Sequence, residues 1–278
     1  MRSVRFASIF FFLFVNTLGW AQQPQTSITP SQDAAAQQTY SASNPPPVTR
    51  DPQAVTVVTQ ALTAVGGVTA ITTITDYTAT GNVTYYLDVD RAVQGSVTVR
   101  AKGLNQLRLD ATLPSGLRSE STDGVTSIKA QDGTVRQLHT QPPLDPGRLA
   151  LPYLQLNSAL NSRSRSLFYK GIVDVDGHPA HDIQVQHILA GTLGQYNKMN
   201  AYLTVDFFVD PSTFQIVMMQ DVVPQGLVRQ IRYSDFRLVS GVSVPFSIGA
   251  RINDQNMWLI DLGAINFNLG LQDSDFQL

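Results

Sequence analysis

The 278-residue chain contains no cysteine and a single glutamate, Glu120. Without cysteine there is no disulfide framework, no thiol nucleophile and no residue to carry a lipid anchor behind a leader. A lone glutamate argues against catalysis by paired glutamates, although a pair of aspartates remains open. A chain of this length can bury a sufficient core without disulfides. These absences favour a protein that is stabilised by packing alone.

The chain also lacks an apolar run of the roughly 20 residues that a membrane-spanning helix needs. Its most apolar stretch, residues 6–18, follows Arg2 and Arg5 and precedes the small residues of the Gly19-Trp20-Ala21 segment. A positive start, a short apolar centre and a small-residue end predict a secretory signal peptide at 1–21. The alternative is an uncleaved anchor. A secreted chain without cysteine fits a bacterial periplasm, which we expect as its location.

Residues 22–49 are rich in Gln, Ala, Ser, Thr and Pro and include Asn-Pro-Pro-Pro at 44–47. Such a composition buries too little apolar surface to offset the entropy of ordering, so it predicts a disordered linker. The remaining residues, 50–278, are expected to form one domain.

Charge and motifs exclude several functions. The net charge is −2 and the isoelectric point is about 6.0, and no basic stripe with interleaved aromatics occurs, which argues against nucleic-acid binding. The sequence contains no nucleophile elbow, no phosphate-binding loop and no His-Glu-x-x-His motif. We therefore expect a protein that is not an enzyme and that uses no cofactor.

The pair His178 and His181 is one candidate ligand group, and His187 is a separate candidate. His178 and His181 follow Asp174 and Asp176, but the Asp-Gly turn at 176–177 would place both at a hairpin rim. A metal site needs three or four converging ligands, so no metal site is expected.

His187 shares the apolar parity of Ile183 and Val185. A lone histidine there is usually a hydrogen-bonded core or strand-end residue, and a ligand role is the lesser alternative.

Two helices are predicted. Asp51 is a suitable N-cap, Pro52 suits the first helical position, and Gly66-Gly67 would end a helix over 52–65. Apolar residues on one face predict a second helix over 149–160.

The rest of the domain alternates apolar and polar residues with the period of two that marks strands. The fold class is therefore mainly β (α+β), a curved antiparallel sheet or incomplete β-barrel lidded by two or more helices. The predicted strands are 77–87, 96–102, 105–111, 116–122, 125–130, 167–175, 180–189, 202–209, 214–222, 228–238, 244–252 and 257–267.

The apolar face of these strands is wider than the helices could cover. About nine or more strands present it, whereas two helices of roughly 12–15 residues are each only about 10 Å across. The sheet must curl on itself or leave an apolar pocket, and an ordinary filled core is the alternative. The candidate lipid-binding residues are Val83, Tyr85, Val97, Val99, Leu107, Leu109, Leu203, Val205, Phe207, Ile216 and Met218.

Four segments carry a resemblance to a known family. They are TDYTATGNVTY at 75–85, VDGHPAHDIQV at 175–185, FFVDPSTFQIVMMQ at 207–220 and YSDFRLVSGVSVPFSI at 233–248. Over 51–278 the chain resembles the periplasmic lipoprotein carriers and sorting proteins of the LolA and LolB type. The resemblance implies an incomplete β-barrel, lidded by helices, with an apolar cavity for acyl chains.

In that family, carriers take lipoproteins from the inner membrane and pass them to an outer-membrane receptor. The resemblance therefore implies acyl chains of lipid or lipoprotein as ligands and membrane-bound envelope proteins as partners. The sequence shows no match for the arginine that governs lid closure in some carriers, and Arg50 and Arg91 are poorly placed candidates.

The sequence thus predicts a secreted, non-catalytic, monomeric binder of acyl chains in cell-envelope lipoprotein sorting. The alternatives are a ligand-free structural or assembly module of the periplasm and, last, a hydrolase.

Overall fold

The computed structural model describes residues 48–88, 90–122, 127–131, 134–138, 149–188, 202–223 and 226–278. All of them belong to one compact unit, Pro45–Leu278. The predicted signal peptide and nearly all of the predicted linker lie outside the described residues, so both remain predictions. No helix within the described ranges is long and apolar enough to cross a membrane.

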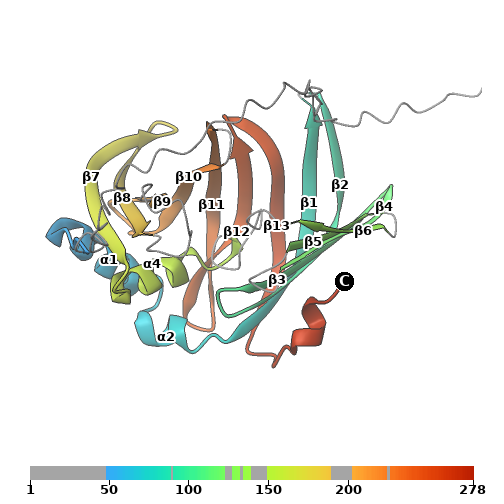
Figure 1. Ribbon diagram of the computed structural model, residues 1–278, viewed down its shortest axis with the longest axis horizontal. Coiled ribbons are helices and arrows are strands. Elements are labelled where there is room, and N and C mark those ends of the chain that lie inside the picture. Colours follow the sequence, from blue (N-terminus) through green and yellow to red (C-terminus); the bar gives the residue numbers. More distant parts are fainter. Residues whose placement is uncertain are drawn as a thin grey trace, which may run out of the picture. The chain divides into compact units, whose positions relative to one another are not determined.

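The described residues form a 13-stranded antiparallel sheet that curves around one face (Figure 1). This confirms the predicted fold class. Each predicted strand range overlaps one strand of the sheet, and β6 lies outside all of these ranges. The strands are β1 (Asp76–Asp88), β2 (Arg91–Lys102), β3 (Gln106–Leu113), β4 (Gly116–Thr122), β5 (Ser127–Gln131), β6 (Thr134–Leu138), β7 (Arg165–Val175), β8 (His178–Ile188), β9 (Tyr202–Val209), β10 (Ile216–Val223), β11 (Leu227–Val239), β12 (Val242–Ile252) and β13 (Gln255–Phe267).

The first and last strands pair at the middle of the sheet. The order is β6-β5-β4-β3-β2-β1-β13-β12-β11-β10-β9-β8-β7, so two runs of hairpins meet where β1 lies beside β13. In that pairing Tyr85 lies opposite Trp258 and Val83 opposite Ile260. The sheet has its two edges at β6 and β7, and a short parallel bridge joins Arg50 to Leu167 at the β7 edge.

The helices form where their local signals predict. The helix α1 (Pro52–Ala64) has Asp51 as its N-cap, whose side chain accepts a hydrogen bond from the Gln53 amide at 2.9 Å. Gly66 follows the helix at φ 126°, and a Cβ there would lie 2.2 Å from the Gly241 carbonyl oxygen. Glycine is therefore required both by the backbone conformation and by the close approach of the β11–β12 turn.

Two helix predictions need correction. The segment between Gly67 and Ile74, for which no helix is predicted above, contains the short helix α2 (Val68–Thr72). The helix predicted over 149–160 begins three residues later as α4 (Pro152–Asn161), because Pro152 fits the first helical position. A final 3₁₀ turn, η3 (Asp273–Phe276), follows β13.

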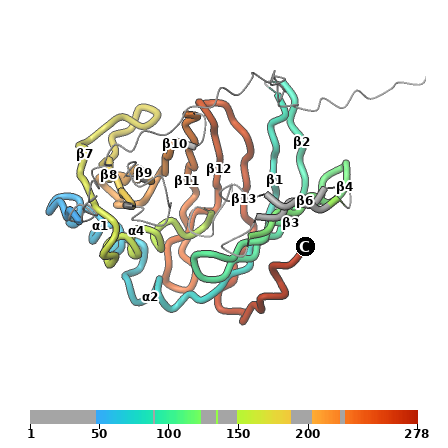
Figure 2. The backbone as a smooth tube through the Cα atoms, viewed as in Figure 1, coloured from blue at the N-terminus to red at the C-terminus, as the bar shows by residue number. Residues whose placement is uncertain are grey.

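The helices gather at one side of the sheet. α1 and α4 pack on each other and on β7, α1 also contacts β8, and α2 contacts α4. Figure 2 traces the chain from α1, beside β7 and β8, through α2 and on to β1, beyond β9–β13. The helix lid is thus concentrated near the β7 edge.

Candidate functional site

The concave face carries one continuous apolar cluster, which α1, α2 and α4 also join. Eight of the predicted lipid-binding residues are buried in it, each at most 8% exposed: Val83, Tyr85, Val97, Val99, Leu107, Leu109, Phe207 and Ile216. The sequence pattern therefore identified most of this face correctly. Whether these side chains contact a lipid stays a prediction.

Strand register explains why these side chains meet. Val99 lies opposite both Ala79 and Leu109, so β1, β2 and β3 present their apolar side chains in one row. Phe207 lies opposite both Ile183 and Met219, which continues the face across β8, β9 and β10. Directly opposed residues of antiparallel strands project to the same side, and hence the rows merge into one surface.

The placement of Met218 on this face is wrong. A β-bulge separates Ile216, which lies opposite Val209, from Met218, which lies opposite Phe208. The extra residue turns Met218 to the outer face, where it packs with Phe208 and Ala180 in a second cluster. Met219 takes its place on the concave face.

The two remaining candidates, Leu203 and Val205, lie towards the start of β9. Val205 is half-buried against the main cluster, whereas Leu203 is 40% exposed. Both share the parity of Phe207, so the concave face becomes more accessible towards the start of β9.

A buried tyrosine fixes α4 to the sheet. The Ile216 amide, at the bulge, donates a hydrogen bond to the Tyr153 hydroxyl at 3.1 Å. Burial raises the pKa of Tyr153 to about 12, partly offset by this hydrogen bond. The phenol is therefore neutral, and it supplies an acceptor where the ladder is interrupted.

Arg50 holds the other end of α4. Its Nη2 donates to the carbonyl oxygens of Ala159, at 3.1 Å, and of Ser162, while its Nη1 donates to the carbonyl oxygen of Arg165. The backbone on either side of Arg50 is paired with Leu167 of β7. One side chain thus joins the C-terminal end of α4 to the sheet, a role that sequence reasoning missed because its acceptors are backbone carbonyls.

Charged residues also occupy the concave face. Arg118 lies opposite the buried Ala111, and Glu120 lies opposite the buried Leu109, so both share the apolar face. On the opposite side of the face, Arg229 binds Asp221 through two hydrogen bonds of 2.9 and 2.7 Å. Both pairs are largely buried. Sequence reasoning named Glu120 as the single glutamate but placed none of these charged residues on the apolar face.

No family model and no curated protein matches this sequence. Solved structures do match. A putative outer membrane lipoprotein-sorting protein domain from Vibrio parahaemolyticus aligns with a TM-score of 0.51 at 8% identity, over 80% of this chain and 95% of that domain. A LolA superfamily protein from Nitrosomonas europaea aligns with a TM-score of 0.50 at 11% identity, over 81% of this chain and 97% of that protein. The chain has the LolA fold.

A DUF1329 family protein from Desulfovibrio piger shares the LolA fold of this chain, with a TM-score of 0.51 at 10% identity over 80% of the chain and 96% of that protein. The predicted resemblance is therefore confirmed as one of fold.

In this LolA fold His181 has local partners. The ring of His181 lies 2.9 Å, at Nδ1, from the Tyr169 hydroxyl and stacks on Phe214. Burial, and then the charge of Arg165, lowers the pKa of His187. No group of three or more potential metal ligands occurs within the described ranges.

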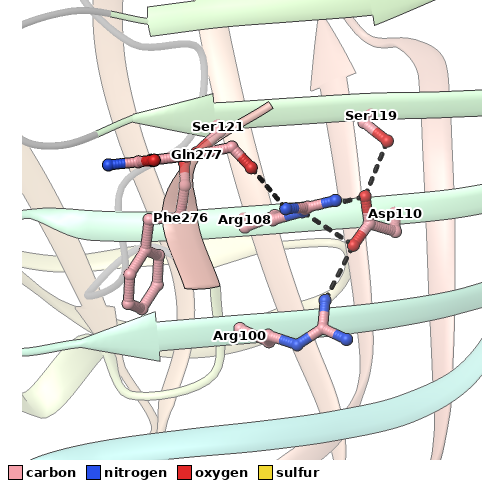
Figure 3. A network of polar contacts seen from close by, with 7 residues as sticks. All are labelled: Arg100, Arg108, Asp110, Ser119, Ser121, Phe276 and Gln277. Atoms are coloured by element: carbon pink, nitrogen blue, oxygen red, sulfur yellow. Dashed lines mark hydrogen bonds and ion pairs between the residues drawn. The ribbon is translucent and has the colours of Figure 1, made fainter. Parts of the chain in front are cut away.

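The outer face of the sheet holds a polar network and the end of the chain (Figure 3). Asp110 accepts hydrogen bonds from Arg100, Arg108 and Ser119. The η3 turn lies over this network, where the Phe276 side chain is buried, and Ser121 donates to the carbonyl oxygen of Phe276. The C-terminal segment therefore occupies the outer face of β3 and β4, opposite the apolar cluster.

A second feature of the outer face is a cavity of about 510 Å³ between the β7–β8 turn and β11. Its wall includes Val175, Ala180 and Val217, and an ion pair between Asp176 and Arg232 lies at its rim.

Proposed function

We propose that this protein is a non-catalytic, periplasmic carrier that binds acyl chains of lipid or lipoprotein on the concave face of its sheet. The LolA fold supports a role of the carrier type. The observation that carries the proposal is the continuous apolar face from β3 to β8, whose helix lid is concentrated near β7 and β8.

The physical basis is burial of hydrocarbon. Each methylene removed from water contributes about 0.8 kcal/mol, so a 16-carbon chain can contribute on the order of 10 kcal/mol before ordering costs. The candidate side chains are buried against one another and against the helices. Ligand entry on this face therefore requires α4 and its neighbours to move away, and an acyl chain would replace the contacts that they give up.

The test is uptake of the neutral apolar probe N-phenyl-1-naphthylamine by protein stripped of copurified lipid. We expect saturable fluorescence enhancement with the wild type. Phe207→Asp should abolish it, but Phe207 is only 1% exposed, so this variant can also unfold.

A matched pair on β9 separates binding from folding. Val205→Trp fills the concave face at a half-buried position, and Thr204→Trp places the same side chain on the outer face. We expect Val205→Trp to reduce probe binding at least tenfold and Thr204→Trp to leave it unchanged. Equal binding by both variants would move the ligand away from this face.

Partners and export belong to the same proposal. We propose that the chain is exported to the periplasm as a monomer and meets membrane-bound envelope proteins there. Membrane fractionation and analytical ultracentrifugation would test these two points.

A ligand-free structural or assembly module is the second candidate. The near-complete burial of Val83, Val99 and Phe207 favours it, because a filled core has the same appearance. The stripped wild type would then take up no probe. That result would reject the carrier function and support the structural module.

A further inference from the structure

The strand β4 has an inverted polarity. Leu117, an apolar residue, is 55% exposed on the outer side, whereas the side chains of Arg118 and Glu120 are only 24% and 19% exposed on the concave side. A shift of pairing by one residue would reverse this arrangement, so the register actively places two charges on the apolar face. A face that bound hydrocarbon alone would bind it better with Leu117 turned inward and the two charged residues turned outward.

Arg118 is held firmly in this position. Its Nη2 donates to Glu120 Oε1 at 2.9 Å, and its guanidinium carbon lies 4.5 Å from the centre of the Tyr85 ring. Tyr85 is itself a member of the apolar cluster. The guanidinium therefore stacks on a wall of the proposed binding face, with its charge inside the concave surface.

The guanidinium is not fully satisfied. Arg118 Nε is buried and has no hydrogen-bond partner in the part of the chain that the structure describes. Buried donors without partners are rare in native proteins because each costs free energy. Arg229, on the other side of the face, differs in that its Nε and Nη2 both bind Asp221. Arg118 thus has a buried donor that is available to a ligand on the concave face.

We propose that Arg118 receives the anionic oxygen group of an amphiphile whose acyl chain lies on the concave face. The inference rests on the proposed function and narrows its ligand from any acyl chain to one that carries a carboxylate or a phosphate. An oxygen anion at Nε forms a charge-assisted hydrogen bond to the planar guanidinium, and Tyr85 keeps that plane oriented.

The experiment is displacement of bound N-phenyl-1-naphthylamine at pH 8 by dodecanoate, dodecyl phosphate and dodecanol. The three ligands share a 12-carbon chain, and the first two carry the two anionic groups. A charge-assisted hydrogen bond in a largely buried site predicts that at least one anion binds about 10- to 100-fold more tightly than the alcohol. The ranking of the two anions distinguishes a carboxylate from a phosphate ligand.

Three variants test whether Arg118 causes the preference for anions over dodecanol. Arg118→Met should bring the anions to the affinity of dodecanol and leave dodecanol itself unchanged. Glu120→Gln removes a competing anion and should strengthen anion binding several-fold. Arg100→Met is the matched control, because Arg100 is ion-paired to Asp110 on the outer face and its loss should change neither ligand class. If Arg118→Met fails to fold, Arg118→Lys keeps the charge but removes Nε, and the anion preference should still fall.

Each result has a definite reading. Equal wild-type affinity for the anions and dodecanol overturns this inference and leaves the carrier function standing. An anion preference that survives Arg118→Met or Arg118→Lys also overturns it. Failure of every 12-carbon ligand to displace the probe, or failure of the probe to bind, rejects the carrier function together with the inference.

Discussion

Arg50 is expected to control how easily α4 leaves the sheet. Its guanidinium binds the carbonyl oxygens of Ala159, Ser162 and Arg165. Arg50→Met keeps much of the aliphatic length and removes all three hydrogen bonds. The change therefore loosens the C-terminal end of α4 while the sheet remains intact.

The magnitude follows from the contacts. A hydrogen bond from a charged group contributes about 1.5–3 kcal/mol when buried, but Arg50 is half-buried and water can replace part of its contacts. We expect a net loss of about 2 kcal/mol in the free energy of local opening. That value corresponds to roughly 30-fold faster hydrogen exchange.

Native-state hydrogen exchange of the α4 amides measures this opening directly. The control is Arg163→Met, which removes an exposed arginine just beyond the same helix. Exchange in α4 should accelerate in Arg50→Met alone, and uptake of the apolar probe should become faster with it. Unchanged exchange in Arg50→Met, or equal acceleration in both variants, would refute the assignment of Arg50 as the residue that holds α4.

Three further outcomes are expected. Burial, and then the nearby Asp206, raises the pKa of Asp182 to about 6. The contribution of this carboxyl to stability is therefore fully present below about pH 4, where it is protonated, and is lost as the pH rises through about 6. After allowance for solvent, Asp182→Asn should remove about 1 kcal/mol of this pH dependence of the unfolding free energy, measured by urea denaturation. Phe276→Ala should cost about 3 kcal/mol of unfolding free energy, whereas Leu269→Ala, at a 58% exposed position, should cost less than about 0.5 kcal/mol; equal costs would contradict the anchoring of the C-terminal segment. Tyr153→Phe leaves the Ile216 amide without its acceptor and should cost about 1–3 kcal/mol by the same measurement, and no loss would show that the contact is dispensable.

The sequence predicted those features that depend on local signals. The N-cap at Asp51, the proline at Pro52 and the glycines after Val65 define α1 within one residue. The alternation in β9 placed Phe207 on the buried face correctly, because that strand contains no break between Tyr202 and Val209.

Features set by register could not be predicted in the same way. The bulge between Ile216 and Met218 reverses the side of every later residue in β10, and nothing in Ile-Val-Met-Met marks it. In β4, neither parity is consistently apolar, so the inward direction of Arg118 is decided by the pairing with β3. The polar part of the candidate site was missed for this reason.

The pairing of β1 with β13 has a consequence for how the protein is made. The Thr75 amide donates a hydrogen bond to the side chain of Asn268 across 193 positions of the sequence. Contacts so distant along the chain slow folding, since a large loop must close before they form. The central seam of the sheet also cannot form until its last strand has left the ribosome. The two runs of hairpins, β1–β6 and β7–β13, can each form before this pairing, with the unpaired edges of β1 and β13 exposed. During synthesis, these edges are where we expect chaperones to be needed most.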